Sequence, residues 1–120
     1  MSYIASNLEH RSHGAVGSGQ CVALVQSWAG APSTATWTQG IKVKGNGHLI
    51  SKGTVIATFV DGHYPNHSSG NHAAIFLSED SSGIRVIDQW SGHAPSERTI
   101  HFKGGHGSAS DDGDAFSVVE

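Results

Sequence analysis

The 120-residue sequence has little cysteine, little charge and no long apolar run. Its single cysteine, Cys21, excludes an intramolecular disulfide and by itself favours a reducing compartment. Only seven residues are Lys or Arg and the formal net charge is −3, so a basic surface for nucleic acid phosphates is lacking. The longest apolar runs, such as 54–60, are far too short to cross a bilayer. These absences argue against a nucleic acid partner and against membrane insertion.

The first twenty residues also lack the apolar stretch of an export signal. Glu9, His10 and Arg11 stand where that stretch would be. We therefore expect a protein made in the cytoplasm without a signal peptide, which needs another carrier if it acts elsewhere. The length fits a single domain spanning 1–120, and sixteen glycines without a Gly-x-y period predict many turns.

The first periodic segment covers 20–29. Its apolar residues recur at i, i+3, i+4 and i+7, as Cys21, Leu24, Val25 and Trp28. That spacing predicts an α-helix buried on one face. Ser18 is the expected N-cap, which would place Cys21 third in the helix, and Gly30 is the expected stop.

Strand patterns dominate the rest of the chain. The expected strands are 41–43 (a short edge strand), 53–60, 72–77, 84–90, 98–102 and 115–119. Segment 72–77 is apolar on both faces after its histidine, as in a central strand, while 84–90 alternates like a half-buried one. One helix followed by an antiparallel meander indicates the α+β class.

Cys21 lies in the first turn of the expected helix. The partial positive charge and free backbone N–H groups there favour a thiolate, and the same groups could hold the oxyanion of a tetrahedral intermediate. Gly17, Ser18 and Gly19 leave room for a substrate. The alternative is that Cys21 is a small buried apolar residue, which is the common fate of a free cysteine. The helix alone does not decide between the two.

His72 is the candidate base among nine histidines. It opens the most apolar strand, directly after Gly70-Asn71, so its ring would be held on rigid backbone at the edge of the core. A general base in a cysteine hydrolase needs such a fixed place within reach of the sulfur. The other eight lie in polar or turn-rich sequence, where an exposed histidine is expected.

Asp88 is unusual because it shares a strand face with Ile84, Val86 and Trp90, where a carboxylate is normally excluded. The short connection 79–83 predicts that 72–77 and 84–90 pair as a hairpin. Partner numbers that sum to an even value, 160 or 162, would put Asp88 on the face of His72, and an odd sum would separate them. Asp88 could then orient the imidazole. The alternatives are a carboxylate bound to loop amides, or Gln89 on the other face as a reserve.

Several stretches resemble a known family. Gly19-Gln20-Cys21 and the residues up to Val25 resemble the nucleophile helix of the cysteine, histidine-dependent amidohydrolase/peptidase (CHAP) domains and their NlpC-type relatives. Segment 53–57 resembles their first core strand, 72–77 the strand opened by the catalytic histidine, and 84–90 the next strand, which carries an acidic or amide residue. The resemblance implies a papain-like fold with Cys21, His72 and Asp88 as catalytic residues.

The small size and Asp88-Gln89-Trp90 resemble type VI secretion amidase effectors in particular. This implies cleavage of an amide bond in the stem peptide or cross-link of peptidoglycan, action in the periplasm of a target bacterium, and a cognate immunity protein that plugs the cleft. Trp90 departs from the pattern, because CHAP domains often carry an asparagine there. No motif after Trp90 matches.

Candidates for substrate contact come from the expected cleft. Tyr64 and His67 lie in the loop 61–70 that leads into His72, although turn composition explains them equally well. Gln20, beside the nucleophile, and Trp37 complete the set. Core packing is the favoured role of Trp28 and Trp90. We expect no cofactor and no metal, because His63, His67 and His72 match no strong zinc pattern.

Two other functions remain open. An acyl-enzyme captured by an amine instead of water would make the protein a thiol acyltransferase. A non-catalytic module that binds the cell wall or a metal on the same fold would bury an unreactive Cys21.

Overall fold

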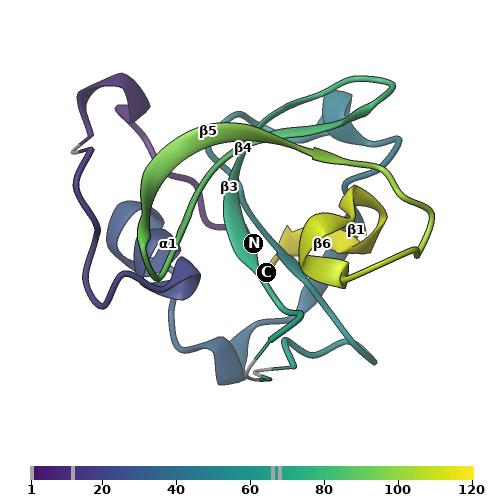
Figure 1. Cartoon of the computed structure of the whole chain (residues 1–120), viewed down its shortest axis with the longest axis horizontal. Helices are drawn as coiled ribbons and strands as arrows, with labels where there is room; N and C mark the ends of the chain where they lie inside the picture. The colour runs from purple at the N-terminus through teal and green to yellow at the C-terminus, as the bar shows by residue number, and fades with distance from the viewer. Residues whose placement is uncertain (1, 12, 66, 68) are drawn as a thin grey trace.

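The computed structural model describes residues 2–11, 13–65, 67 and 69–120. Within them, the one α-helix is α1 (Cys21–Ala29), which precedes all strands (Figure 1). Short 3-10 helices lie in the connections: η1 (Leu8–His10), η2 (Thr34–Thr36), η3 (Gly47–Leu49), η4 (Ala109–Asp111) and η5 (Gly113–Ala115). None of the helices in these described ranges is long and apolar enough to cross a membrane.

The strands form one antiparallel sheet of six, in the order β1-β6-β2-β3-β4-β5. Their bounds are β1 (Gln39–Lys42), β2 (Val55–Thr58), β3 (Ala73–Glu79), β4 (Gly83–Trp90), β5 (His93–His101) and β6 (Phe116–Val119). Strands β2 to β5 are a meander, and β6 returns to pair with β2. The α+β class, the central position of β3 and the edge position of β1 are confirmed.

The start of α1 differs from the prediction. The helix begins at Cys21 with Gln20 as N-cap, so the expected cap at Ser18 was wrong. Gly17 and Gly19 have left-handed backbone, with φ of 56° and 85°, and a right-handed helix cannot run through them. The end is as predicted: Gly30, with φ of 69°, donates its N–H to Gln26.

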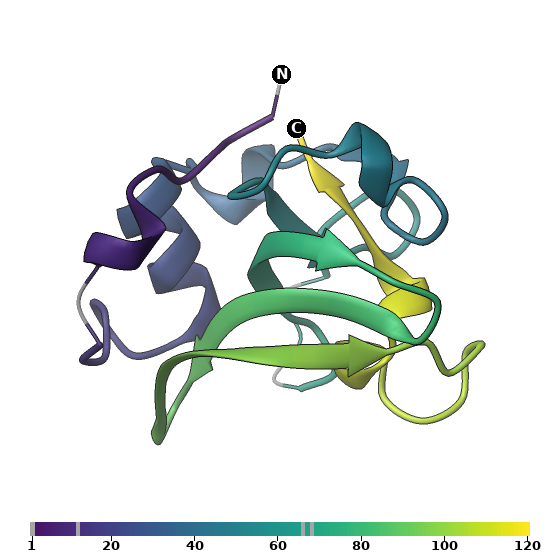
Figure 2. The same ribbon diagram turned by 90° about the horizontal axis from the view of Figure 1, so that it is seen from above.

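Both faces of the sheet are buried, because the sheet curls around one of them. α1 covers the other face, where Leu24, Val25 and Trp28 join the core that contains Ile75 and Ile87. In Figure 2 strands β3 to β5 bend strongly away from α1. The hollow side of that bend holds a second core: Val43, Ile56, Ala74, Phe76, Ile84, Val86, Ile100, Phe116 and Val118. The half-buried β4 predicted from alternation was therefore wrong, and its exposed residues are Arg85 and Trp90.

Strand β5 begins five residues earlier than the expected 98–102. A tight turn at Ser91-Gly92 leads directly into it, and Trp90 pairs with His93. Pro95 obscures this start in the sequence, since proline lacks the N–H that a strand interior needs. It is tolerated here because β5 is the outer strand of the sheet.

The register between β3 and β4 determines which side chains meet at the end of β3 that follows His72. There Ile75 pairs with Ile87 and Phe76 with Val86, so the partner numbers sum to 162. A bulge between Phe76 and Ser78 shifts the register by one at the far end only. The even sum puts Asp88 on the face of His72, diagonally across the strand pair, as one of the two acceptable registers predicted.

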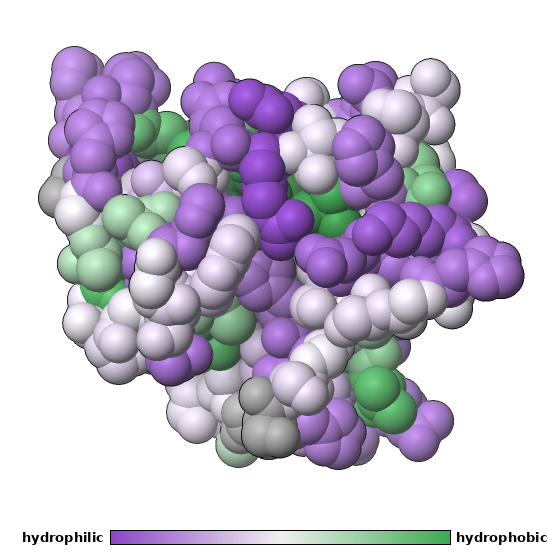
Figure 3. Space-filling view, viewed as in Figure 1, coloured by the Kyte–Doolittle hydropathy of each residue, from purple (hydrophilic) through white to green (hydrophobic). Residues whose placement is uncertain are grey.

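The start of the described chain and the end of β6 lie close together in both ribbon views (Figures 1 and 2). On the face shown in Figure 3 polar side chains prevail, and apolar ones show as small separate areas, several of them in hollows. Because only 14% of residues are charged, uncharged polar residues must supply much of this polar surface.

The N-terminal segment approaches the chain before β2 closely at Gly53. Its φ is 100°, its carbonyl accepts the Ala5 N–H at 2.8 Å, and an added Cβ would overlap the Ala5 carbonyl oxygen. Gly62 has a φ of 80° with open space around it. We expect Gly62→Ala to cost about 1 kcal/mol through backbone strain alone, and Gly53→Ala to cost a further ~1–3 kcal/mol through overlap. Urea unfolding of both variants measures the difference, and equal losses would contradict the close approach.

Candidate active site

The structure brings the three predicted catalytic residues together. Cys21 is the first residue of α1, His72 directly precedes β3, and Asp88 lies in β4. His72 donates from Nε2 to Asp88 Oδ2 at 2.7 Å, and the two residues are 5% and 0% exposed. Because Nε2 is engaged by the carboxylate, Nδ1 is the ring nitrogen left for the thiol. Cys21 itself is partly exposed. The Cys21 thiol is thus open to solvent while its partners lie behind it.

The environment of Cys21 favours the thiolate. Burial raises the pKa of the thiol, but the hydrogen bond to His72 and the positive charge of that ring lower it more. The backbone N–H of Ala73 and the Tyr64 hydroxyl add smaller contributions in the same direction. The pKa of Cys21 therefore lies below its ordinary value, as a nucleophile requires.

His72 is held in its protonated form. Burial lowers the pKa of the imidazole, yet the hydrogen bonds to Asp88 and Cys21, together with the charges of both partners, raise it to about 9. The two shifts have one origin, because each charge stabilises the other. The lowered pKa of Cys21 and the raised pKa of His72 together favour a thiolate–imidazolium pair.

Asp88 has a second partner that the sequence did not reveal. Arg98, on β5, donates from Nε to the same Oδ2 atom at 2.7 Å, and its guanidinium lies 5.1 Å from the Trp90 ring centre. A fully buried carboxylate needs such compensation, since an unpaired buried charge is costly. Arg98 pairs with Val86, two residues from Asp88 on the same face, so it could have been found had the β4–β5 register been evident.

Tyr64 stands next to the nucleophile. Its hydroxyl oxygen lies 3.8 Å from Cys21 Sγ and accepts a hydrogen bond from Asn71 Nδ2 at 3.1 Å. Burial raises the pKa of the phenol, and the charge of Cys21 raises it further. The hydroxyl therefore keeps its proton. With one lone pair taken by Asn71, that proton is available to an anion at the sulfur.

A cleft of about 350 Å³ opens over Cys21. Its lining is mostly polar: Gln20, Cys21, Val22, Gln26, Ser33, Thr34, Tyr64, His67 and Asn71. Of the residues expected to contact substrate, Gln20, Tyr64 and His67 lie in this wall. Trp37 does not, because it is 2% exposed and packs behind Tyr64 at a ring-centre distance of 5.0 Å.

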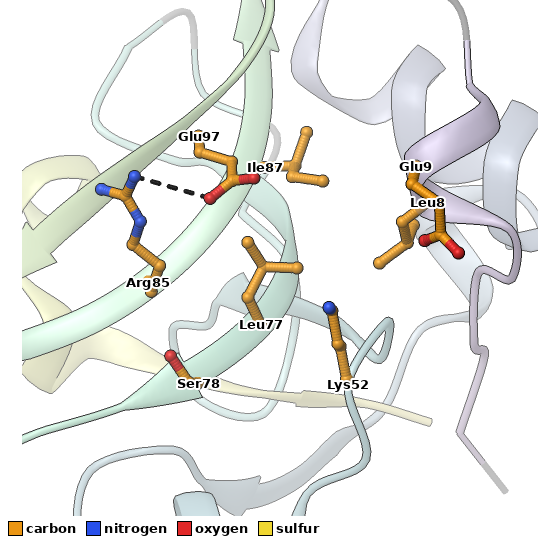
Figure 4. A pocket seen from close by; sticks show the side chains of 8 residues that line it. All are labelled: Leu8, Glu9, Lys52, Leu77, Ser78, Arg85, Ile87 and Glu97. Carbon is orange, nitrogen blue, oxygen red and sulfur yellow. Dashed lines mark ion pairs between the residues drawn. The ribbon is translucent and has the colours of Figure 1, made fainter.

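A second hollow of about 350 Å³ is separate from this centre (Figure 4). Its side chains come from the N-terminal region, from the connection before β2 and from strands β3 to β5, and include an ion pair between Arg85 and Glu97 at 3.5 Å. The lining is Leu8, Glu9, Lys52, Leu77, Ser78, Arg85, Ile87 and Glu97. None of the three catalytic candidates contributes to it.

Comparison with known proteins assigns the chain to a family. The family described as domesticated amidase effector 2 (Dae2) matches residues 2–119. The chain belongs to this family. A "Type VI secretion amidase effector 2 protein" of Salmonella typhi is 58% identical over 71 residues, which are 59% of this chain and 53% of that protein. A "Domesticated amidase effector 2" of Ixodes scapularis is 39% identical over 104 residues, 84% of this chain and 70% of that protein.

The fold agrees with a solved member. The structure of type 6 secretion amidase effector 2 (Tae2) superposes with a TM-score of 0.86 at 39% identity, over 98% of this chain and 94% of the other. The resemblance to papain-like amidases, and in particular to type VI amidase effectors, is thereby confirmed for this Dae2 family chain. Amidases are hydrolases, so the enzyme class follows from the family.

The tryptophans of this Dae2 family chain differ in their surroundings. Trp28, on the buried face of α1, packs in the core, as predicted. Trp90 is 40% exposed, so the expectation that it packs in the core was wrong. It ends β4, where the turn to β5 leaves it exposed, and it stacks on His93 at a ring-centre distance of 3.9 Å. Its ring also meets that of His72 in an edge-to-face arrangement at 6.3 Å. In the part of the chain that the structure describes, no three His, Cys, Asp or Glu side chains are grouped to hold a metal ion.

The pH dependence of thiol reactivity tests the ion pair. We expect iodoacetamide to alkylate Cys21 with a midpoint below the ordinary thiol pKa. In His72→Ala the midpoint should move to higher pH, because burial remains while the main stabilising partner is gone. Alkylation rates across pH, followed by intact-protein mass spectrometry, measure both midpoints. His101→Ala, an exposed histidine on β5, is the control. An unchanged midpoint in His72→Ala would contradict the pair.

Asp88→Asn tests the support of the imidazole. The substitution keeps the shape but removes the charge, and leaves His72 at best a weaker, neutral hydrogen bond in place of the charged one that raises its pKa. We therefore expect that pKa to fall below its value of about 9. NMR titration of the His72 ring measures it. Asp111→Asn removes only the exposed carboxylate that lies 3.5 Å from Arg98, and should leave the pKa unchanged. Equal pKa values of His72 in the wild type and Asp88→Asn would contradict the proposal that Asp88 stabilises the imidazolium.

Proposed function

We propose that this chain is a cysteine amidase that cleaves an amide bond in the stem peptide or cross-link of peptidoglycan. The observation that carries the proposal is the joining of Cys21, His72 and Asp88 under a polar cleft. The proposal agrees with the names of the relatives, which are amidase effectors. The alignment with the Salmonella typhi protein spans only 53% of that protein, so its activity is transferred here as part of the proposal.

The first half of the reaction forms an acyl-enzyme. The Cys21 thiolate attacks the carbonyl carbon of the scissile amide, which forms an S–C bond and moves the carbonyl electron pair onto oxygen. The backbone N–H of Cys21, in the first turn of α1, and the Tyr64 hydroxyl are the proposed donors to that oxyanion. His72 gives its proton to the leaving amine as the C–N bond breaks.

The second half returns the enzyme. Neutral His72 accepts a proton from water, and the resulting hydroxide adds to the acyl carbon. The C–S bond then breaks, which releases a carboxylic acid and the Cys21 thiolate beside imidazolium, and the acid loses its proton to solvent. Asp88 keeps the ring oriented throughout and stabilises its positive charge. No metal or cofactor takes part in these steps.

Substrate contact falls to the residues that line the cleft. Gln20, Tyr64 and His67 present amide, hydroxyl and imidazole groups beside the nucleophile, which suits a peptide rich in amides and carboxylates. Trp37 would act through Tyr64, whose ring it supports. Cleavage of the bound peptide at Cys21 would weaken the cell wall from the periplasmic side.

The biological setting is that of an antibacterial type VI secretion effector. A chain of this kind reaches the periplasm of a target bacterium by way of the secretion machine, and a cognate immunity protein would protect the producer by filling the cleft over Cys21. The relative from Salmonella typhi, whose name includes type VI secretion, supports this setting.

Incubation with purified peptidoglycan fragments tests the activity. We expect the wild type to yield new stem peptides or unlinked dimers, and Cys21→Ala to reduce their rate of formation by about 10⁴-fold or more. Mass spectrometry identifies the bond that is cut, and thermal unfolding establishes that the variant is folded. Intact fragments with folded wild type would refute the amidase. New amide adducts formed only with an added acceptor amine would instead show a thiol acyltransferase.

The pH profile of hydrolysis gives a second test. Activity should rise with pH as Cys21 ionises, with a midpoint below the ordinary thiol pKa. It should fall again at about pH 9, because His72 then loses the proton that the leaving amine needs. Initial rates between pH 5 and 11 would trace both limbs. A profile that keeps rising beyond pH 10 would contradict the assignment of His72 as the general acid.

A further inference from the structure

Gln89 is buried beneath the segment that leads into the nucleophile. It follows Asp88 in β4, is 0% exposed, and faces α1 as the even register requires. Its Oε1 accepts the Val16 N–H at 2.9 Å, and its Nε2 donates to the carbonyls of Val16 at 2.9 Å and Gln20 at 2.8 Å. Figure 2 shows the chain before α1 running beside the end of β4. One carboxamide thus ties residues at both ends of the turn before Cys21 to the sheet.

The bond to Gln20 bears directly on Cys21. The carbonyl of Gln20 and the N–H of Cys21 belong to one planar peptide group and point in opposite directions. A donor that fixes the carbonyl therefore fixes the direction of the N–H. The same carbonyl also accepts the Ala23 N–H at 3.1 Å, within the first turn of α1. With two donors, the Gln20–Cys21 peptide has little freedom to rotate.

The turn itself would not hold this peptide. Gly17 and Gly19 have positive φ, and glycine peptides rotate at low cost. Within the turn, Gly19 donates to the Val16 carbonyl at 3.0 Å and Gln20 to Ser18 Oγ at 3.4 Å. Gln89 occupies both the N–H and the carbonyl of Val16, which anchors the start of the turn to β4 as a neighbouring strand would. The rigidity of the turn thus comes from the sheet.

We propose that Gln89 is a positioning residue that aims the Cys21 backbone N–H at the oxyanion formed during acyl transfer. The proposal rests on the proposed cysteine amidase function, and specifies how one of its donors is held in place. An oxyanion donor must be oriented before the reaction, because reorientation would consume the stabilisation that it provides. Gln89 touches no substrate and leaves the Cys21–His72 pair untouched, so its effect should be confined to reactions that form an oxyanion.

Two reagents separate this role from a merely structural one. Acylation of Cys21 by p-nitrophenyl acetate forms an S–C bond through a tetrahedral oxyanion and expels p-nitrophenolate with the bonding pair. Alkylation by iodoacetamide also forms an S–C bond, but displaces iodide without an oxyanion. Both reactions require the thiolate, so their ratio isolates the oxyanion donors. Neither depends on peptidoglycan, which keeps this test separate from the test of the amidase activity.

The variants are Gln89→Met, which keeps the bulk and removes all three hydrogen bonds, and Gln89→Glu, which keeps the acceptor for Val16 but removes the donor to Gln20. Ile84→Val is the matched control, because it weakens the buried core of the same strand at its other end. Thermal unfolding identifies the variants that fold, and Gln89→Glu carries the test if Gln89→Met does not fold.

We expect both variants to lower the acylation rate about 10-fold or more. The alkylation rate should stay within about 2-fold of the wild type, and its pH midpoint should not change, because the Cys21–His72 pair is intact. Ile84→Val should change neither rate. Equal losses in acylation and alkylation would assign Gln89 to the thiolate or to the fold and overturn the proposal. Full acylation in a folded variant, or a wild type whose acylation is no faster relative to alkylation than that of a free thiol, would overturn it as well.

Discussion

The pairing of β3 with β4 is the constraint on which the site depends. At the end near His72 the partner numbers sum to 162, which directs Asp88 to one face of the sheet and Gln89 to the other. Asp88 thereby reaches His72, and Gln89 reaches the turn before Cys21. A slip of one residue would exchange the two faces and remove both sets of contacts. The bulge near Leu77 accommodates the extra residue away from this end, so the register at the site is preserved.

Charge balance explains how so many ionised groups coexist in a small interior. The Cys21 thiolate and the Asp88 carboxylate lie on opposite sides of the His72 ring, and Arg98 neutralises the carboxylate from β5. When Cys21 is a thiolate and His72 an imidazolium, negative and positive groups alternate, so that each charge has an opposite neighbour. Such compensation is what makes burial of a carboxylate tolerable. Through Asp88 and His72, Arg98 on β5 thereby influences the ionisation of Cys21 at the start of α1.

Much of the site could be predicted from the sequence because its residues break local patterns: a cysteine at a helix start, a histidine opening an apolar strand, an aspartate on an apolar strand face. The remainder depends on contacts that local patterns do not encode. The first residue of α1 is set by left-handed glycines whose turn is held by Gln89, 73 residues away from Val16. Prediction of Arg98 as a partner of Asp88 would have required the β4–β5 register, which Pro95 obscures in the sequence. Burial of both faces of β4 required the curl of the sheet.

The division of labour between regular elements and loops follows from these contacts. The groups proposed to perform the chemistry sit at the start of α1 and on or next to β3 and β4, where backbone hydrogen bonds fix them. Most of the cleft wall comes from connections, including Ser33, Thr34, Tyr64 and His67. Loops tolerate substitution better than packed elements do. Substrate preference can therefore change along the wall while the thiolate, its acid and its oxyanion donor keep their geometry.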